Sequence, residues 1–177
     1  VGKVQIKITN PTNDEVLVST REKLNVSATI SFQGSTTVQG TFEIFYNNVS
    51  VQTGTCGFPK CNATLTNITE SGTVKFVGTP PGSTETGEAS FQVTLAPTVV
   101  EETMPNGLLD GINYSADATK ATLVLTAPNK DFVQVAGSFN NYTPTSSDVM
   151  KKDPNTGKFW LEINNLTVGQ IETYQYW

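Results

Sequence analysis

The stretch LNVSATISF, residues 24–32, alternates strictly between apolar and polar side chains. Its apolar members are Leu24, Val26, Ala28, Ile30 and Phe32. Successive side chains of a strand point to opposite faces, so this pattern predicts a half-buried strand whose apolar face needs a second sheet against it. The same alternation recurs at residues 42–46 and 91–95.

The rest of the chain supports an all-β fold. No window carries sustained apolar spacing of three and four residues, so we expect almost no helix. Short apolar runs separated by polar turns predict two immunoglobulin-like β-sandwiches in tandem. We place the first at residues 1–97 and the second at residues 112–177.

Residues 98–111 mix proline, glycine and acidic residues between the two strand-rich blocks, as a linker does. Pro105 and Gly107 interrupt any helix there. The segment also contains apolar residues, which we expect to lie against one or both sandwiches. They are Val99, Val100, Met104, Leu108 and Leu109.

The chain has two cysteines, Cys56 and Cys61, which span the residues GFPK. Because the sequence has no histidine, a zinc site would lack its usual ligands, and a disulfide is favoured over free thiols. Closing so short a loop stabilises by about 2 kcal/mol in the chain-entropy model. A disulfide predicts an oxidising compartment, so we expect a secreted, cell-surface or periplasmic protein.

The sequence contains seven Asn-X-Ser/Thr sequons. In a eukaryotic secreted protein they would be sites of N-glycosylation, whereas in a Thr- and Asn-rich bacterial β-protein they arise by composition alone. We favour the second interpretation. The sequons begin at Asn25, Asn48, Asn62, Asn67, Asn113, Asn141 and Asn165.

The composition excludes several classes of function. The net charge is −5 without a Lys/Arg cluster, so nucleic acid is a poor partner. No apolar run is long enough to predict a membrane span. Without histidine there is no His-based catalysis, and we find no phosphate loop, catalytic carboxylate pair, metal site or cofactor motif. Asp153 in DPNTG is predicted to form a turn rather than to bind a metal. We therefore expect no catalytic activity from this chain alone.

The stretch FVQVAGSFNNY, residues 132–142, predicts a strand that pairs as a hairpin with residues 121–125 and then bends at Gly137. Tyr142 follows two asparagines that tolerate turn geometry. Its flat ring can stack on the C–H face of a sugar, so Tyr142 is a candidate carbohydrate-binding residue.

The pieces GINYS, KATLVLTAPNKDFVQVAGSFNNY, MKKD, GKFWLEINNL and ETYQYW come in an order that carries a family resemblance. They resemble the immunoglobulin-like module that precedes the barrel in glycoside hydrolase family 13 enzymes, especially secreted bacterial α-amylases. Among binding modules, they are similar to carbohydrate-binding module family 48. The resemblance covers about the last two fifths of the chain.

The resemblance implies which residues would contact a sugar. Tyr142 takes the place of the glycogen-binding loop tryptophan, and Gln175 takes the place of a sugar-contacting lysine. Both replacements weaken the contacts, so the implied affinity is about millimolar, or about −4 kcal/mol. In this family the strand at TYQYW turns into further strands, which implies that the second sandwich is truncated and that its last strand lacks a neighbour.

Trp160 in FWLEI points away from the face shared by Phe159, Leu161 and Ile163. An outward tryptophan is costly unless something covers it. Two alternatives are open: Trp160 is a sugar platform or a contact with a neighbouring domain, or the module is covered on both faces and Trp160 belongs to its core.

These expectations combine into a functional hypothesis. The chain would be a non-catalytic accessory region of a secreted bacterial α-glucan-degrading enzyme, acting as a spacer that docks on a downstream catalytic barrel and binds α-glucan weakly. The alternative is a surface glycan-binding or adhesion protein without a catalytic domain.

Overall fold

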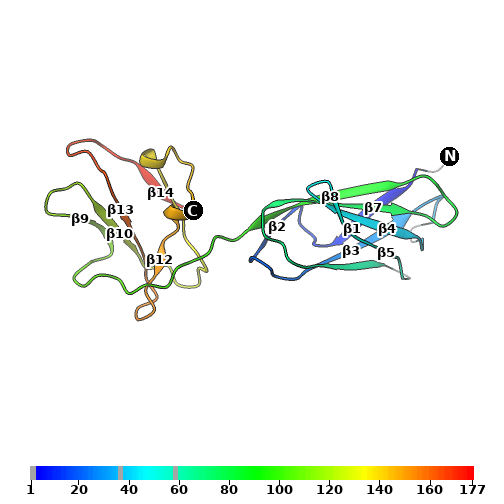
Figure 1. The fold of residues 1–177 in the computed structure, drawn as a ribbon, viewed down its shortest axis with the longest axis horizontal. Coiled ribbons are helices and arrows are strands. Elements are labelled where there is room, and N and C mark those ends of the chain that lie inside the picture. Colours follow the sequence, from blue (N-terminus) through cyan, green and yellow to red (C-terminus); the bar gives the residue numbers. More distant parts are fainter. Residues whose placement is uncertain (1–2, 36–37, 58–59) are drawn as a thin grey trace. The chain divides into compact units, whose positions relative to one another are not determined.

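The computed structural model describes residues 3–35, 38–57 and 60–177. Nearly all regular structure in these ranges is β-strand, with two 3₁₀ turns of three residues each. The chain divides into two compact units, Val1–Ala96 and Pro97–Trp177. Figure 1 shows that both are built from strands, which confirms the predicted all-β class with sandwich-like domains.

The first unit is a sandwich of two sheets. A three-stranded sheet has the order β1-β3-β6, and a five-stranded sheet has the order β2-β8-β7-β4-β5. Strands β2 and β8 pair in parallel, and the other pairs are antiparallel. The strands are β1 (Gln5–Asn10), β2 (Glu15–Val18), β3 (Leu24–Ser31), β4 (Thr41–Tyr46), β5 (Val49–Thr55), β6 (Cys61–Leu65), β7 (Gly72–Thr79) and β8 (Gly87–Leu95).

The alternation in β3 sets the core of the first unit. Val26, Ala28 and Ile30 are fully buried between the sheets, while the residues between them are exposed or half-buried. Ile44 and Phe76 meet them from the opposite sheet. The predicted half-buried strand is therefore confirmed, and its apolar face forms the centre of the sandwich.

A disulfide joins Cys56 and Cys61, as predicted. Its Cα–Cα distance is 4.2 Å, and it closes the connection between β5 and β6. Phe58 and Pro59, in the loop that it encloses, lie outside the described residues.

The second unit has a four-stranded sheet, β12-β13-β10-β9, and a two-stranded sheet, β11-β14. Its own buried cluster includes Leu123, Val135, Met150, Phe159 and Leu161. The elements are β9 (Gly111–Tyr114), β10 (Ala121–Leu125), β11 (Val135–Gly137), the 3₁₀ turns η1 (Ser138–Asn140) and η2 (Ser146–Asp148), β12 (Lys151–Lys152), β13 (Phe159–Ile163) and β14 (Tyr174–Tyr176).

One pairing prediction is wrong. We expected residues 121–125 and 132–136 to form a hairpin, but β10 pairs with β9 and β13, while β11 pairs with β14. The loop at residues 126–134 carries the chain from one sheet to the other. Val133 and Val135 are apolar enough to line the second layer of the core, and this burial outweighs pairing between sequence neighbours.

Strand β14 has a strand neighbour on one side only in the described ranges. It pairs with β11 through Val135–Tyr176, Ala136–Gln175 and Gly137–Tyr174. Backbone hydrogen bonds between Gln134 and Trp177 extend this ladder in both directions, at 3.0 and 2.9 Å.

Residues 97–110 fold onto the second unit. The amide of Lys152 donates to the carbonyl of Val100 at 2.9 Å, and the amide of Glu102 donates to the carbonyl of Lys152 at 3.1 Å. Val99 packs against the second core, whereas Leu109 remains 75% exposed. This segment therefore runs along the β12 edge of the four-stranded sheet, where Glu101 forms a parallel bridge with Lys152.

Candidate functional site

The candidate site lies on the outer face of the β11–β14 sheet. Tyr174 and Tyr176 pack against the second core. Gln175, between them in β14, is exposed and therefore projects from the opposite face. Thr173 precedes β14 and accepts a 2.9 Å hydrogen bond from the amide of Ser138, so it continues the ladder.

The loop after β11 is held by several hydrogen bonds. Asn140 accepts from the amide of Gly137 at 2.8 Å through its side-chain oxygen and donates to the carbonyl of Val135 at 2.9 Å. The amide of Tyr142 donates to the carbonyl of Gly137 at 2.8 Å. Asn141 and Tyr142 both have φ of 53°, a left-handed conformation that is strained for an aromatic residue. These bonds hold the backbone in that conformation.

Gly137 is required by the close approach of its neighbours. Its φ of −158° is ordinary extended backbone, so conformational freedom is not the reason. A Cβ built on Gly137 would lie 2.7 Å from the carbonyl oxygen of Thr173 and would collide with the ring of Phe139. The bend predicted at this glycine is therefore a point of contact between β11 and the residue before β14.

Tyr142 is 43% exposed, and its hydroxyl contacts the side-chain hydroxyl of Thr173. Thr173 and Gln175 are two residues apart in the same ladder, so their side chains share a face about 7 Å apart. The structure thus brings Tyr142 and Gln175 to one face of β14, although the sequence separates them by 33 positions (175 − 142). An aromatic ring and a primary amide on one open face can stack on and hydrogen-bond a sugar.

Trp160 does not belong to this site. It lies in β13, opposite Val124 and Lys151, and is only 5% exposed. Its indole N–H donates to the carbonyl of Glu102 at 3.0 Å, and the ammonium of Lys151 lies 4.6 Å from a ring centroid. A sugar cannot stack on a ring buried in this way, so of the two alternatives for Trp160 the core role holds, and its candidacy as a carbohydrate-binding residue is corrected. The sequence predicted that apolar residues of 98–111 lie against a sandwich, but it could not show that Glu102 and Lys151 contact the indole ring.

Asp153 is 3% exposed, and its side chain accepts from the hydroxyl of Thr156 at 2.6 Å and from the amide of Asn155 at 3.2 Å. The backbone of Gly157, with φ of 71°, closes the turn onto the carbonyl of Asp153 at 2.8 Å. The hydrogen bond from Thr156 is the main cause that lowers the pKa of Asp153, and Met104 contributes a backbone donor. The predicted turn role is confirmed.

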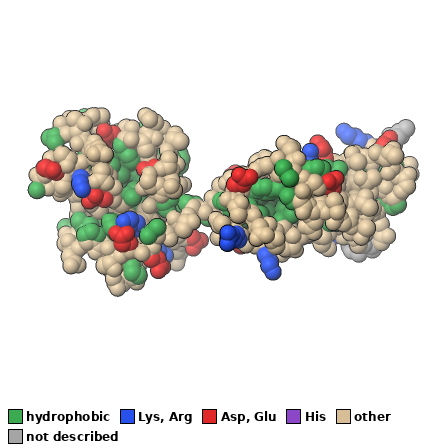
Figure 2. Space-filling model, viewed as in Figure 1, with side chains coloured by type: hydrophobic (Ala, Val, Ile, Leu, Met, Phe, Trp, Pro, Cys, Tyr) green, Lys and Arg blue, Asp and Glu red, His purple; other side chains and the backbone are tan. Residues whose placement is uncertain are grey.

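Other kinds of functional site have little support among the residues that the structure describes. They contain no cluster of three or more His, Cys, Asp or Glu side chains that could hold a metal ion. They also contain no helix long and apolar enough to cross a membrane. Figure 2 shows Lys and Arg side chains scattered over the visible face rather than gathered into a patch.

Comparisons with known proteins concern the fold. No family model matches the chain, and no curated protein matches it. Solved structures do match. The fibronectin(III)-like modules of Clostridium thermocellum CbhA share 13% identity over 52% of this chain and 99% of that chain, with a TM-score of 0.38.

Two further solved structures match nearly the whole chain. The three N-terminal domains of the highly immunogenic outer capsid protein of bacteriophage RB49 share 12% identity over 98% of this chain and 61% of that chain, with a TM-score of 0.42. The β-glucuronidase 3 of Bacteroides uniformis shares 12% identity over 97% of this chain, with a TM-score of 0.38. The chain spans 23% of that enzyme.

Proposed function

We propose that this chain is a non-catalytic accessory region of a secreted enzyme that degrades α-glucans such as starch or glycogen. The second unit would bind the glucan weakly through Tyr142 and Gln175, and both units would act as a spacer that docks on the catalytic barrel of the same polypeptide. The disulfide supports an oxidising, extracytoplasmic location.

The observation that carries the proposal is the shared outer face of Tyr142, Thr173 and Gln175. The contact between the Tyr142 and Thr173 hydroxyls restrains the ring, which lowers the entropy that stacking would cost. Gln175 supplies an amide donor and an acceptor to sugar hydroxyls. Tyr142 and Gln175 also stand at the positions where the family resemblance of residues 112–177 implies a sugar-contacting tryptophan and lysine.

The expected affinity is low. Tyrosine offers a smaller ring than tryptophan, and a neutral amide forms weaker hydrogen bonds than an ammonium group. Two such contacts on an open face are consistent with a millimolar Kd, or about −4 kcal/mol. Such a site would concentrate the enzyme on a polymer that offers many copies of the ligand rather than capture single oligosaccharides.

Titration with maltoheptaose, followed by amide NMR of the chain, tests the proposal. We expect saturable shifts at Tyr142, Thr173 and Gln175, with no direct effect at buried Trp160. Tyr142→Ala and Gln175→Ala should each weaken binding. Tyr114→Ala is a matched control, because Tyr114 is 67% exposed but lies in β9 of the other sheet. Absence of shifts at tens of millimolar sugar would exclude glucan binding, and a full-length polypeptide without a barrel would favour an adhesion protein.

A further inference from the structure

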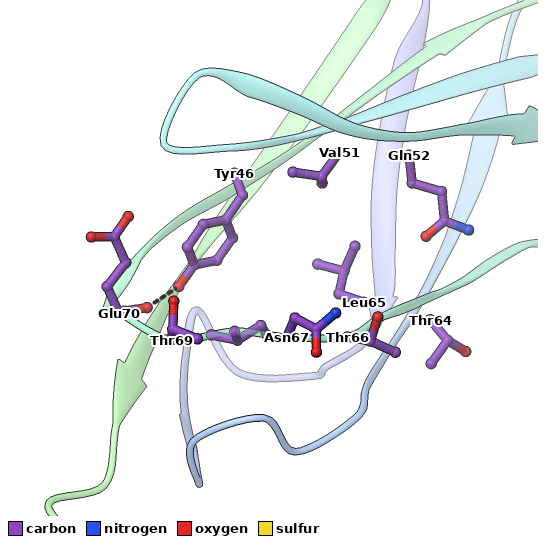
Figure 3. A pocket seen from close by; sticks show the side chains of 10 residues that line it. Tyr46, Val51, Gln52, Thr64, Leu65, Thr66, Asn67, Thr69 and Glu70 are labelled. Atoms are coloured by element: carbon purple, nitrogen blue, oxygen red, sulfur yellow. Dashed lines mark hydrogen bonds between the residues drawn. The ribbon is translucent and has the colours of Figure 1, made fainter.

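A hollow of about 200 Å³ lies on the first unit, between β4–β5 and the segment that joins β6 to β7. Figure 3 shows Tyr46 of β4 and Gln52 of β5 on one side of the hollow, and Leu65 of β6 and Asn67 of the joining segment on the other. The hollow lies entirely within the first unit and is therefore distinct from the face of β14.

The aromatic wall of the hollow is fixed. The hydroxyl of Tyr46 donates to the carbonyl of Glu70 at 2.6 Å, which anchors the ring at its far end (Figure 3). Burial is the main cause that raises the pKa of Tyr46, and the negative charge of the nearby Glu70 carboxylate raises it further. The phenol therefore remains a hydrogen-bond donor at neutral pH. Leu65 and Ile68, each 5% exposed, add an apolar floor. A fixed ring beside apolar carbons suits the C–H face of a pyranose.

Unpaired polar groups surround this wall. Within the described part of the chain, the side chains of Gln52, Thr66, Asn67 and Thr69 form no hydrogen bond with protein groups. Asn47 donates to one oxygen of the Glu70 carboxylate at 3.3 Å, which leaves the other oxygen open. The hollow therefore offers amide donors and acceptors, hydroxyls and a carboxylate, which is the set that binds vicinal sugar hydroxyls.

The charge of the lining narrows the class of ligand. Glu70 is the one charged side chain among the described residues that line the hollow, and none of them is Lys or Arg. An anionic ligand would meet a like charge without a compensating cation. A polyhydroxylated neutral ring matches both the stacking surface and the polar groups.

We propose that this hollow binds a neutral saccharide, with one pyranose ring against Tyr46 and its hydroxyls bonded to Gln52, Asn67 and Glu70. The volume is below the range of about 300–1,000 Å³ typical of drug-sized ligands, so the hollow holds one ring while the rest of an oligosaccharide stays in solvent. This second site does not depend on the proposed function of β14.

The test is amide NMR of the bacterially expressed 177-residue chain. The probes are maltotriose, cellotriose, xylotriose and mannotriose, with glucuronic acid and glucose 6-phosphate as anionic probes. We expect at least one neutral trisaccharide to give saturable shifts at Tyr46, Gln52 and Asn67, and the anionic probes to give none there.

Variants test whether the hollow causes the shifts. Gln52→Ala should raise the Kd about 3- to 10-fold through a lost hydrogen bond, and Glu70→Gln should also weaken binding. Thr53→Ala is the matched control, because Thr53 is the next residue of β5, is exposed and lies outside the lining; its Kd should change less than about 2-fold. Thermal unfolding of each variant checks that the fold is retained.

Several results would overturn the proposal. These are no shift with any neutral probe at about 50 mM, equal binding of the anionic probes, or an unchanged Kd in Gln52→Ala. A covalent glycan on Asn67 of the naturally produced protein, detected by intact mass, would fill the hollow instead and would also overturn it. If maltotriose shifts signals at Tyr142 and Gln175 and no neutral probe shifts Tyr46, Gln52 and Asn67, the second site is excluded while the proposed function of β14 stands.

Discussion

Replacing Trp160 with phenylalanine tests whether its ring is part of the core. The substitution removes the hydrogen bond from the indole N–H to the carbonyl of Glu102, worth about 0.5–1.5 kcal/mol net. The smaller ring also loses buried apolar area worth about 1 kcal/mol. The free energy of unfolding of the second unit should therefore fall by about 1.5–2.5 kcal/mol. Trp160→Ala should cost about 3–5 kcal/mol because it leaves a cavity.

Urea denaturation and thermal melts measure this change. Each kcal/mol should lower the Tm by about 4–8 °C in a domain of this size. Trp177→Phe is the control, because the Trp177 side chain is 54% exposed and should contribute less than about 0.5 kcal/mol. The sequence has two tryptophans, so this control also leaves Trp160 as the sole indole emitter.

The reasoning about Trp160 would be refuted by equal unfolding free energies for Trp160→Phe and Trp177→Phe. It would also be refuted if the native Trp177→Phe protein emitted at the wavelength of a fully solvated indole. Sugar binding gives an independent check, since Trp160→Phe should leave the maltoheptaose Kd unchanged while it lowers stability.

Three further predictions concern other parts of the chain. Gly137→Ala should lower the free energy of unfolding of the second unit by about 1–3 kcal/mol in urea denaturation, because a Cβ there would lie 2.7 Å from the carbonyl oxygen of Thr173. An unchanged urea midpoint would show that β11 and β14 separate easily enough to accommodate the methyl group. Replacing both Cys56 and Cys61 with serine should cost the first unit about 2 kcal/mol in a thermal melt, the loop-closure entropy of the bridge, and the second unit should melt as before. Hydrogen bonds from Ser115 and then Thr119 lower the pKa of Asp117 from 3.8 to about 2, so its stabilising effect is present above pH 4 and is lost as the pH falls toward 2. Asp117→Asn should remove this part of the acid dependence of unfolding, and identical acid profiles for the two proteins would contradict it.

The predictable part of the fold rests on local pattern. The alternation in β3 specifies which of its residues are buried, because a strand presents successive side chains to opposite faces. The short spacing of Cys56 and Cys61, with no histidine nearby to suggest zinc, specified the disulfide. The Asp-Pro-Asn-Thr-Gly turn at Asp153 follows from the conformational preferences of its own residues.

The candidate sites depend on contacts between distant parts of the chain. The placement of Gln175 on the same face as Tyr142 depends on the pairing of β11 with β14. The family resemblance implied that both residues contact a sugar, but the sequence did not reveal this pairing, which contradicts the expected hairpin. The hollow at Tyr46 was not anticipated at all. Its lining comes from β4, β5, β6 and the segment before β7, none of which carries a binding motif.

The sequence by itself determined an all-β chain, the buried faces of its strands, its disulfide and the absence of histidine chemistry, because these follow from residue type and spacing. Only the tertiary structure decided that the carbonyl of Glu102 accepts from the buried indole of Trp160, and that β14 pairs with β11 so that Tyr142 and Gln175 share an exposed face. Both outcomes depend on which segments pack together. That choice is made by burial summed over the whole unit rather than by the preferences of any one segment.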